Sequence, residues 1–336
     1  MNMIKKQDMY SVVTGGAGFI GSHLVDLLLK NGHHVCIIDN LSTGRLANIE
    51  SFSDEVKFIE ADLGEESGKW IDHITSADYI FHLASLADIV PSIEKPGEYF
   101  NANVISTLNI LKNIRPSRLK KIVYAASSSC YGLTTEFPTS ENAACDPQYP
   151  YALTKLMGEE LLLHWCKVYS IPGVSTRFFN VYGTRSRTSG TYGAVFGIFL
   201  AQKLAGVPYT VVGDGRQKRD FTYVTDVCEG ILQAAESEIT NEVFNIGSGT
   251  PQSINRLVEL LGGEVVYIPK RPGEPEITHA DISKAKRLLG YSPKISFEEG
   301  VKRVLDEIDY WKEAPVWTPQ TIQQATKVWF NRLGKV

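Results

Sequence analysis

The residues with the clearest chemical potential are a run of three serines, Ser127, Ser128 and Ser129, and the later pair Tyr151 and Lys155. Tyr151 and Lys155 are four positions apart, so on a helix they share one face. A nearby ammonium lowers the pKa of a phenol from about 10 toward neutrality, which makes the phenolate usable as a general base. Because ordinary helices also carry this pair, its meaning depends on the surrounding elements.

The stretch VVTGGAGFIGSHL places Gly15, Gly18 and Gly21 between a strand-like run and a helical one. Glycine allows a tight turn and a close approach to a pyrophosphate, which then faces free amides at the positive helix end. Asp39 ends the next strand-like run, where a carboxylate would bind a ribose hydroxyl and repel a 2′-phosphate. This pattern predicts NAD rather than NADP, although Arg45 nearby leaves NADP open, and a glycine turn without a ligand is the plain alternative.

Two further strand ends point to the same crevice, because parallel strands bind ligands beyond their carboxyl ends. EADL ends the third strand-like run and FHLAS ends the fourth. The residues predicted to bind the cofactor are Gly15, Gly18, Phe19, Ile20, Gly21, Asp39, Asn40, Asp62, Leu63, Leu83 and Ala84, together with Tyr151 and Lys155.

These motifs lie in an alternating pattern of short β-branched runs and helical segments. The pattern predicts an α/β fold with a Rossmann-type, doubly wound parallel sheet and a smaller C-terminal α/β substrate lobe. The predicted strands are 10–15, 34–39, 56–62, 79–84 and 121–127, and the first helix is 21–32.

The second half of the chain changes in composition. The polar stretch 184–193 and the Pro-containing stretch 271–276 are predicted loops, and 282–311 is a predicted helix, turn and helix. The strand-like runs 174–183 and 242–249 are expected to rejoin the large sheet. We therefore predict a cofactor domain at 1–183 with returning segments near 211–250, and an interleaved substrate lobe at 184–336. Hydrophobic residues of the tail 314–334 have near-helical spacing and predict core packing or subunit contact.

Composition excludes several classes of function. The chain has 336 residues, with 34 Lys plus Arg against 38 Asp plus Glu, and its net charge of -4 creates no field for nucleic acid or an anionic membrane. Five scattered cysteines without CxxC spacing argue against disulfides and a metal site. The start of the chain has no signal core, and no run reaches the length of a membrane span, so a cytoplasmic protein is expected.

In combination, TGGAGFIG, FHLAS, SSSCYG, YPYALTK, RFFNVYG and GDGRQKRDFTYVTDV resemble the extended short-chain dehydrogenase/reductase superfamily. Within it the chain resembles the NAD-dependent nucleotide-sugar epimerases and dehydratases over about residues 9 to 312. The resemblance implies a tightly bound NAD, a homodimer, and a role in polysaccharide biosynthesis. It also implies that Tyr151 is the general base and that Lys155 orients the nicotinamide ribose and lowers the Tyr151 pKa. Ser127 would form a hydrogen bond with the 4-hydroxyl of the sugar.

The three serines bear on which reaction follows the shared 4-keto intermediate. A 4,6-dehydratase needs a further acid and base, which that family commonly places where this chain has Ser128 and Ser129, whereas a 4-epimerase needs neither. The serines therefore favour a 4-epimerase. The alternative is a 4,6-dehydratase in which Asp88 supplies the acid chemistry, and several motifs also resemble a legionaminic-pathway dehydratase subgroup. The plain interpretation of Asp88 is a helix cap.

The resemblance also predicts a pocket for the nucleotide sugar. Arg219 and Arg271 would clamp its pyrophosphate, and Asn180 would hold a sugar or phosphate oxygen. Thr278 stands where hexose-specific epimerases have a bulky tyrosine, which predicts room for an N-acetyl group. The substrate-binding residues predicted in full are Asp88, Ser128, Ser129, Asn180, Val195, Arg219, Arg271, Glu274 and Thr278.

The expected substrate is a UDP- or GDP-hexose, N-acetylated at carbon 2, with UDP-N-acetylglucosamine and its 4-epimer as the first choice and UDP-glucose and UDP-galactose as further ones. Two other classes compete with this interpretation. A non-catalytic NAD-binding protein is disfavoured because Ser127, Tyr151 and Lys155 are all present, and an NADPH-exchanging reductase is disfavoured by Asp39. The predicted dimer pairs the helix of Tyr151 with the segment 101–114.

Overall fold

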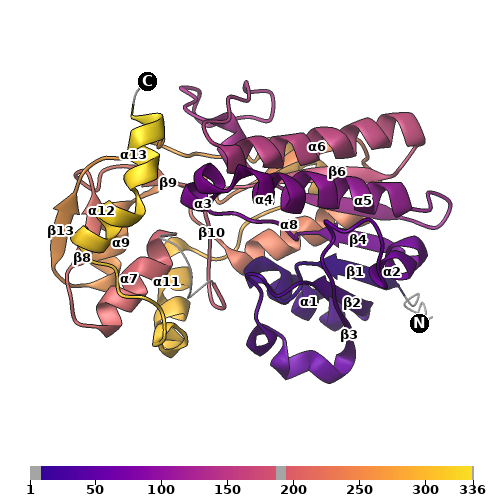
Figure 1. The fold of residues 1–336 in the computed structure, drawn as a ribbon, viewed down its shortest axis with the longest axis horizontal. Coiled ribbons are helices and arrows are strands. Elements are labelled where there is room, and N and C mark those ends of the chain that lie inside the picture. The colour runs from indigo at the N-terminus through magenta and orange to yellow at the C-terminus, as the bar shows by residue number, and fades with distance from the viewer. Residues whose placement is uncertain (1–8, 187–193, 335–336) are drawn as a thin grey trace.

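The computed structural model describes residues 9–186 and 194–334, so part of the predicted loop 184–193 lies outside the described residues. A seven-stranded parallel sheet forms its centre (Figure 1). The strands are β1 (Tyr10–Thr14), β2 (His34–Asp39), β3 (Val56–Glu60), β4 (Tyr79–His82), β5 (Lys121–Ser127), β6 (Gly173–Phe178) and β11 (Glu242–Ile246). As the sequence predicted, β6 and β11 return to the large sheet.

The strand order is β11, β6, β5, β4, β1, β2, β3, and every neighbouring pair is parallel. The order reverses between β1 and β4, so the helices that follow these two strands leave a crevice at their carboxyl ends. This arrangement is the doubly wound Rossmann-type sheet, and the predicted fold class is confirmed.

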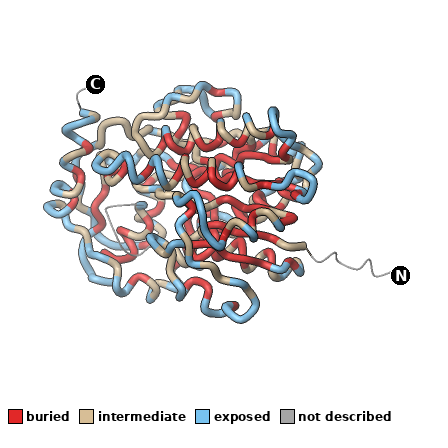
Figure 2. Tube along the Cα trace, turned by 45° about the vertical axis from the view of Figure 1, so that its right-hand side comes forward, coloured by how far each residue is buried: buried red, intermediate tan, exposed pale blue. Residues whose placement is uncertain are grey.

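Helices cover both faces of the sheet, and side chains that alternate along each strand fill two cores. Val12 and Ile122 belong to the core beneath α2, α5 and α6, whereas their chain neighbours Val13 and Val123 pack toward α1 and α8. The strands of the large sheet are buried along most of their length except the edge strand β3, and Figure 2 shows the buried chain in the interior. The helices are α1 (Phe19–Lys30), α2 (Trp70–Ser76), α5 (Ser106–Asn113), α6 (Pro150–Tyr169) and α8 (Val224–Glu236).

The second lobe is built from short strands and helices on the opposite side of the crevice (Figure 1). Its parallel pair is β8 (Tyr209–Val212) with β13 (Val265–Ile268), and the predicted helix, turn and helix are α10 (Ser283–Leu289) and α11 (Phe297–Asp306). The other helices here are α7 (Val195–Leu204), α9 (Ile254–Leu261), α12 (Pro319–Ala325) and α13 (Lys327–Leu333). The predicted bounds of the two domains stay a prediction.

The remaining elements connect the two parts. Two-stranded pairs are formed by β7 (Val181–Tyr182) with β10 (Thr222–Tyr223) and by β9 (Lys218–Arg219) with β12 (Gln252–Ser253). The short helices α3 (Ile89–Glu94) and α4 (Pro96–Phe100) follow β4.

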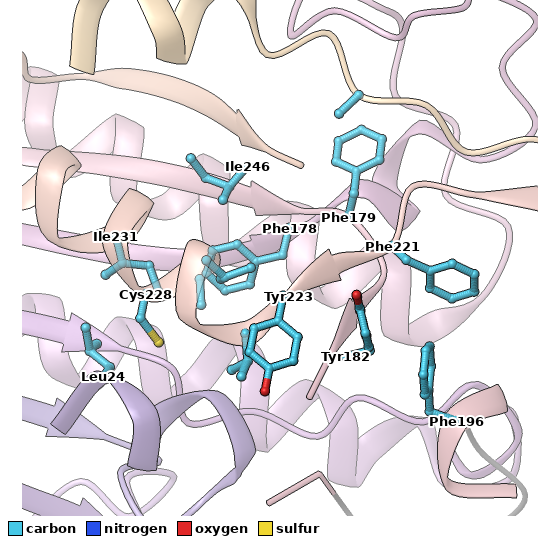
Figure 3. Close-up of a cluster of buried hydrophobic side chains, with 14 of the residues drawn as sticks. Leu24, Phe178, Phe179, Tyr182, Phe196, Phe221, Tyr223, Cys228, Ile231 and Ile246 are labelled. Carbon is cyan, nitrogen blue, oxygen red and sulfur yellow. The ribbon is translucent and has the colours of Figure 1, made fainter. Parts of the chain in front are cut away.

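An aromatic cluster packs these connecting segments against one another (Figure 3). The rings of Tyr182 and Phe196 stack with centroids 4.5 Å apart, and those of Phe221 and Phe297 stack at 5.2 Å. These residues come from β7, α7, the segment before β10, and α11. Large buried rings contribute much apolar area, so the cluster holds the two lobes in one arrangement.

A buried ion pair fixes α6 to the sheet. Glu159 of α6 accepts hydrogen bonds from the Arg177 guanidinium of β6 (Nη2 to Oε1, 2.5 Å) and from the Ser175 hydroxyl (2.7 Å). The two charged side chains are only 6 % and 3 % exposed. The same guanidinium lies 4.8 Å from the ring centroid of Tyr131, which follows the three serines. One charged contact therefore joins the helix of Tyr151 to the strand beside it and to the serine turn.

Glu159→Ala should destabilise the protein by about 3–5 kcal/mol, because it leaves the Arg177 charge buried without its partner. The control is Glu299→Ala, which removes an ion pair with Arg303 on the surface of α11. The side chains of Glu299 and Arg303 are 45 % and 43 % exposed, so the loss of this pair should lower the free energy of unfolding by less than about 1 kcal/mol. Urea denaturation of both variants measures the two free energies of unfolding. Equal losses in the two variants would contradict the role assigned to the buried pair.

Candidate active site

A cavity of about 690 Å³ lies at the carboxyl ends of the sheet strands and extends into the second lobe. Every residue predicted for the two sites lies in its wall, and their roles toward ligands remain predictions. The cofactor part contains Gly15, Gly18, Phe19, Ile20, Gly21, Asp39, Asn40, Asp62, Leu63, Leu83 and Ala84. The substrate part contains Asp88, Ser128, Ser129, Asn180, Val195, Arg219, Arg271, Glu274 and Thr278. The predicted catalytic residues Ser127, Tyr151 and Lys155 line the same cavity.

The glycine turn after β1 makes a cradle that side chains would fill. Gly15 has a φ of +71°, and a Cβ there would lie 2.7 Å from the backbone nitrogen of Ala84. A Cβ at Gly21 would collide with the carbonyl oxygen of Gly15. The turn leads into α1, whose first residues Phe19 and Ile20 line the cavity. Close backbone and a helix N-terminus suit a pyrophosphate, so this turn fits a dinucleotide.

Asp39 at the end of β2 is buried, and its carboxylate already holds the neighbouring backbone. It accepts hydrogen bonds from the amides of Ala17 (3.0 Å) and Leu41 (2.8 Å). Burial raises its pKa, and the two amide hydrogen bonds act in the opposite direction. Each carboxylate oxygen can accept a second bond, so the group can both hold this turn and bind a ribose hydroxyl.

Two more predicted cofactor residues form a pair at the cavity. Asn40 donates from Nδ2 to a carboxylate oxygen of Asp62 at 3.1 Å, which joins the segments that follow β2 and β3. After β4, the amide of Ala84 donates to the Thr14 hydroxyl at 3.2 Å, which ties β4 to β1 at the switch point.

The three serines form a compact turn at the end of β5. Ser127 caps the 3₁₀ helix Ser128–Tyr131, and its Oγ accepts from the amide of Ser129 (3.2 Å) and from the Ser129 hydroxyl (2.8 Å). The Ser127 side chain also acts on the phenol of Tyr151 near the start of α6, where it lowers the pKa of that phenol. The serine turn therefore positions the predicted base.

Tyr151 lies in a buried environment. Burial raises the pKa of its phenol, the Ser127 side chain lowers it, and the charge of Asp88 raises it further. Its ring stacks on that of Tyr149, with centroids 6.3 Å apart and planes 10° apart.

The expected effect of Lys155 on the pKa of Tyr151 stays a prediction. The Lys155 Nζ lies 4.6 Å from the ring centroid of Tyr124 in β5. Burial lowers the Lys155 pKa to about 7, while the nearby Glu159 acts to raise it. The shared helix face predicted that Tyr151 and Lys155 are neighbours but not that Lys155 is buried, and burial disfavours its charged form.

Asp88 begins α3 at the cap position, but its side chain makes no capping hydrogen bond within the described residues. Its carboxylate lines the cavity and acts on the phenol of Tyr151. The plain interpretation as a helix cap is therefore right about its position and wrong about its bonding.

The second half of the cavity holds a cluster of charges. Glu274 lies 3.1 Å from the Arg219 guanidinium and 3.8 Å from that of Arg271, so one carboxylate faces two arginines. Thr278 donates its hydroxyl hydrogen bond to Asn180 at 2.6 Å and accepts one from the amide of Asp220. Two cationic groups around one anion make a site that can bind a pyrophosphate.

Several aromatic residues of the cavity wall, including Tyr149, Trp317 and Trp329, were not among the predicted site residues. The ring of Tyr149 stacks on that of Tyr151. The sequence signal that could have indicated Tyr149 is its position two residues before Tyr151. Trp317 and Trp329 of the tail also line the cavity, although the tail predicted only core packing or subunit contact. Trp329 is indeed buried, yet it packs against the site itself.

The described residues contain no group of three or more His, Cys, Asp or Glu arranged for a metal ion. No helix in the described ranges 9–186 and 194–334 is long and apolar enough to span a membrane. All five cysteines are free thiols, and the Sγ atoms of Cys130 and Cys145 lie 3.8 Å apart.

Comparisons with known proteins agree with this geometry. A profile described as the NAD dependent epimerase/dehydratase family matches residues 11–247. A putative UDP-glucose 4-epimerase of Methanocaldococcus jannaschii is 37 % identical over 302 residues, which cover 88 % of this chain and 97 % of the relative.

Two solved structures are similar over nearly their whole length. A UDP-N-acetylglucosamine 4-epimerase from Methanobrevibacter ruminantium, in complex with UDP-N-acetylmuramic acid, has 33 % identity and a TM-score of 0.83, covering 89 % of this chain and 99 % of that one. A UDP-glucuronic acid 4-epimerase from Bacillus cereus, in complex with UDP-glucuronic acid and NAD, has 35 % identity and a TM-score of 0.82, covering 91 % of this chain and 99 % of that one.

The fold and the cavity define an enzyme with a dinucleotide cofactor. The chain belongs to the NAD-dependent epimerase/dehydratase family. It is an NAD-dependent enzyme of the epimerase class, and the cradle formed by Gly15, Gly18 and Gly21 fits this cofactor.

Lys155→Met should reduce the rise of stability with pH. In the folded chain the pKa of Lys155 is lowered to about 7, whereas in the unfolded chain it is about 10.4. Between these values the unfolded state binds more protons, so the free energy of unfolding rises with pH, by at most about 1.4 kcal/mol per unit. Urea denaturation at pH 7 and 9, on protein freed of bound nucleotide, measures this rise. The exposed Lys302→Met is the control, and an equal pH dependence in wild type and Lys155→Met would contradict the buried lysine.

Proposed function

We propose that this protein is a nucleotide-sugar 4-epimerase that acts through a transient 4-keto intermediate. Its preferred substrate is an N-acetylated UDP-hexose, UDP-N-acetylglucosamine or UDP-N-acetylgalactosamine, with UDP-glucose and UDP-galactose as further substrates. The names of the similar proteins support a UDP-sugar, because they act on glucose, glucuronic acid and N-acetylglucosamine linked to UDP.

The arrangement of Ser127 and Tyr151 supports the first step. Ser127 and Tyr151 both line the cavity and the Ser127 side chain acts on the phenol, so a sugar hydroxyl bound between these two groups would give its proton to Tyr151. Bound NAD would accept a hydride from carbon 4 and return it. Lys155, on the same face of α6, would bind the ribose of the cofactor and favour the deprotonated phenol only in its charged form.

One observation carries the proposal of epimerisation over dehydration. Ser128 and Ser129, in the cavity wall beside Ser127, present hydroxyls where a dehydratase needs an acid and a base. In the structure the Ser129 hydroxyl donates to Ser127 and so supports the catalytic turn. A serine hydroxyl with an ordinary pKa transfers no proton from carbon near neutral pH, whereas epimerisation requires only that the keto sugar turn over between two hydride transfers.

A second candidate function is supported by Asp88. Asp88 lines the cavity and its charge raises the pKa of Tyr151, so its carboxylate is the candidate for further acid–base chemistry at the sugar. In a 4,6-dehydratase acting on GDP- or UDP-N-acetylglucosamine, Asp88 would take the proton from carbon 5 or protonate the departing 6-hydroxyl.

The preference for an N-acetyl group rests on Thr278. Its short side chain lines the cavity and is held by Asn180 and by the amide of Asp220, so it does not swing into the space beside the sugar. A tyrosine at this position would fill that space.

The proposal includes a homodimer in which α6 meets the segment 101–114. Val104, Ile110 and Leu111 of that segment are buried within the chain, but Leu153 of α6 is 46 % exposed and Phe100 is 41 % exposed. These two exposed apolar side chains suit a subunit contact. A cytoplasmic location and the supply of sugar donors for polysaccharide biosynthesis also belong to the proposal.

Tyr151→Phe should lower turnover of UDP-N-acetylglucosamine by about 10²-fold or more, because it removes the general base while the ring remains. The matched control is Tyr149→Phe, which removes the neighbouring hydroxyl and should retain most activity. Turnover is followed by NMR of the product, and the mass of the product is recorded with UDP- and with GDP-N-acetylglucosamine. Full activity of Tyr151→Phe would contradict the mechanism.

The product mass separates the two candidate functions. A new isomer of unchanged mass is the expected result and supports the 4-epimerase. Loss of one water would instead support the 4,6-dehydratase, and Asp88→Asn should then abolish that loss.

Thr278→Tyr should lower turnover of UDP-N-acetylglucosamine at least about 10-fold and spare UDP-glucose, because the larger ring would clash with the acetamide. Thr278→Val has nearly the same volume and is the control for the lost hydrogen bond to Asn180. Steady-state kinetics of wild type and both variants with UDP-N-acetylglucosamine and UDP-glucose measure this change in substrate preference. The pocket argument fails if Thr278→Tyr uses both substrates like wild type, or if wild type strongly prefers UDP-glucose.

A further inference from the structure

The tail of the chain returns from the second lobe to the cavity and is fixed there at two points. At the first, the buried side chain of Gln202 donates to the carbonyl oxygen of Trp317 (2.8 Å) and to the hydroxyl of Thr210 in β8 (2.9 Å). Beyond Trp317, α12 and α13 follow, and α13 packs against α3 beside the cavity (Figure 1). The tail is therefore a wall of the substrate part.

The second fixed point is Trp329 in α13, whose side chain is 3 % exposed. Its indole Nε1 donates to the carbonyl oxygen of Pro272 at 2.7 Å. The guanidinium carbon of Arg271 lies 5.5 Å from the centroid of the same indole. One indole therefore holds both the backbone of the loop 271–276 and the charged end of the arginine that precedes Pro272.

The orientation of Arg271 matters because the side chain faces the cavity. Arg271 lines the wall together with Arg219, and both guanidinium groups approach the same carboxylate of Glu274. An arginine that is already oriented loses less side-chain entropy when it binds an anion than one that is free to rotate. An aromatic ring packed against the flat face of the guanidinium restricts the rotation of the side chain. The N–H groups lie in the plane of the guanidinium and stay available to an anion.

We infer that Trp329 is a positioning residue, which holds Arg271 in the orientation that binds the pyrophosphate of the substrate. This inference rests on the proposed function, because it takes the ligand of the two arginines to be a nucleoside diphosphate. It assigns to the tail a part in substrate affinity, while proton and hydride transfer take place at the other end of the cavity.

The experiment is a double-mutant cycle on the full chain with its bound NAD, using UDP as the probe in titration calorimetry. Trp329→Leu should weaken UDP binding about 5- to 10-fold, and Trp329→Phe, which keeps a ring and loses the N–H donor, should weaken it less. In the Arg271→Ala background, Trp329→Leu should have no further effect. The KM of the nucleotide sugar should rise by a similar factor in Trp329→Leu, with kcat within about two-fold of wild type.

The control is Phe330→Leu, at the neighbouring position of the same helix, where the ring is 36 % exposed. It should leave UDP affinity unchanged. Unaltered UDP affinity in Trp329→Leu, or an equal loss with and without Arg271, would overturn the inference, because the indole would then act only as packing or through another contact. Wild-type protein that retains NAD and binds neither UDP nor GDP would instead overturn the proposed function, and the inference with it.

Discussion

The buried contact between Arg177 and Glu159 is the interaction on which the arrangement of the site depends. Charges that are removed from water need partners, and here each meets the other, with Ser175 and the ring of Tyr131 completing the environment. Because Glu159 lies in α6, the pair fixes the helix that carries Tyr151 and Lys155 against β6. Because Arg177 also faces Tyr131, the same pair fixes the turn of Ser127. Tyr151, Lys155 and Ser127 thus share one anchor.

This anchor also has an electrostatic consequence for the helix it holds. Glu159 is one turn beyond Lys155 and favours the charged lysine, against the burial that disfavours it. A lysine balanced in this way responds to small changes in its surroundings, as groups at functional sites often do. The pKa of the buried Tyr151 is set by similarly opposed effects, with burial and Asp88 on one side and the Ser127 hydroxyl on the other. The acid–base behaviour of the site is therefore a property of its packing.

The substrate part of the cavity gathers positive charge in a protein whose net charge is -4, which is what a charged ligand requires. Arg219 and Arg271 are gathered at the cavity, and Glu274 lies between them. The carboxylate offsets the repulsion between the two guanidinium groups, which allows both to face the same space. The tail adds the indole of Trp329 beneath one of them. In the proposed function, substrate affinity comes from this end of the cavity and the chemistry takes place at the other.

Much of the fold and the site could be predicted from the sequence because the features concerned are local. A glycine with positive φ, a strand that ends in Asp39, and a tyrosine one helical turn before a lysine are each contained in a short stretch of chain. The alternation of strands and helices likewise determined the class of sheet. Every residue that the motifs assigned to a predicted site lines the cavity. Only the tertiary structure decided the contacts between distant segments: Lys155 over Tyr124, Asp88 near Tyr151, Glu274 shared by two arginines, and Trp329 against Pro272. The physical reason is that pKa values, ion pairs and packing depend on burial and on neighbours in space, which no short stretch of sequence contains.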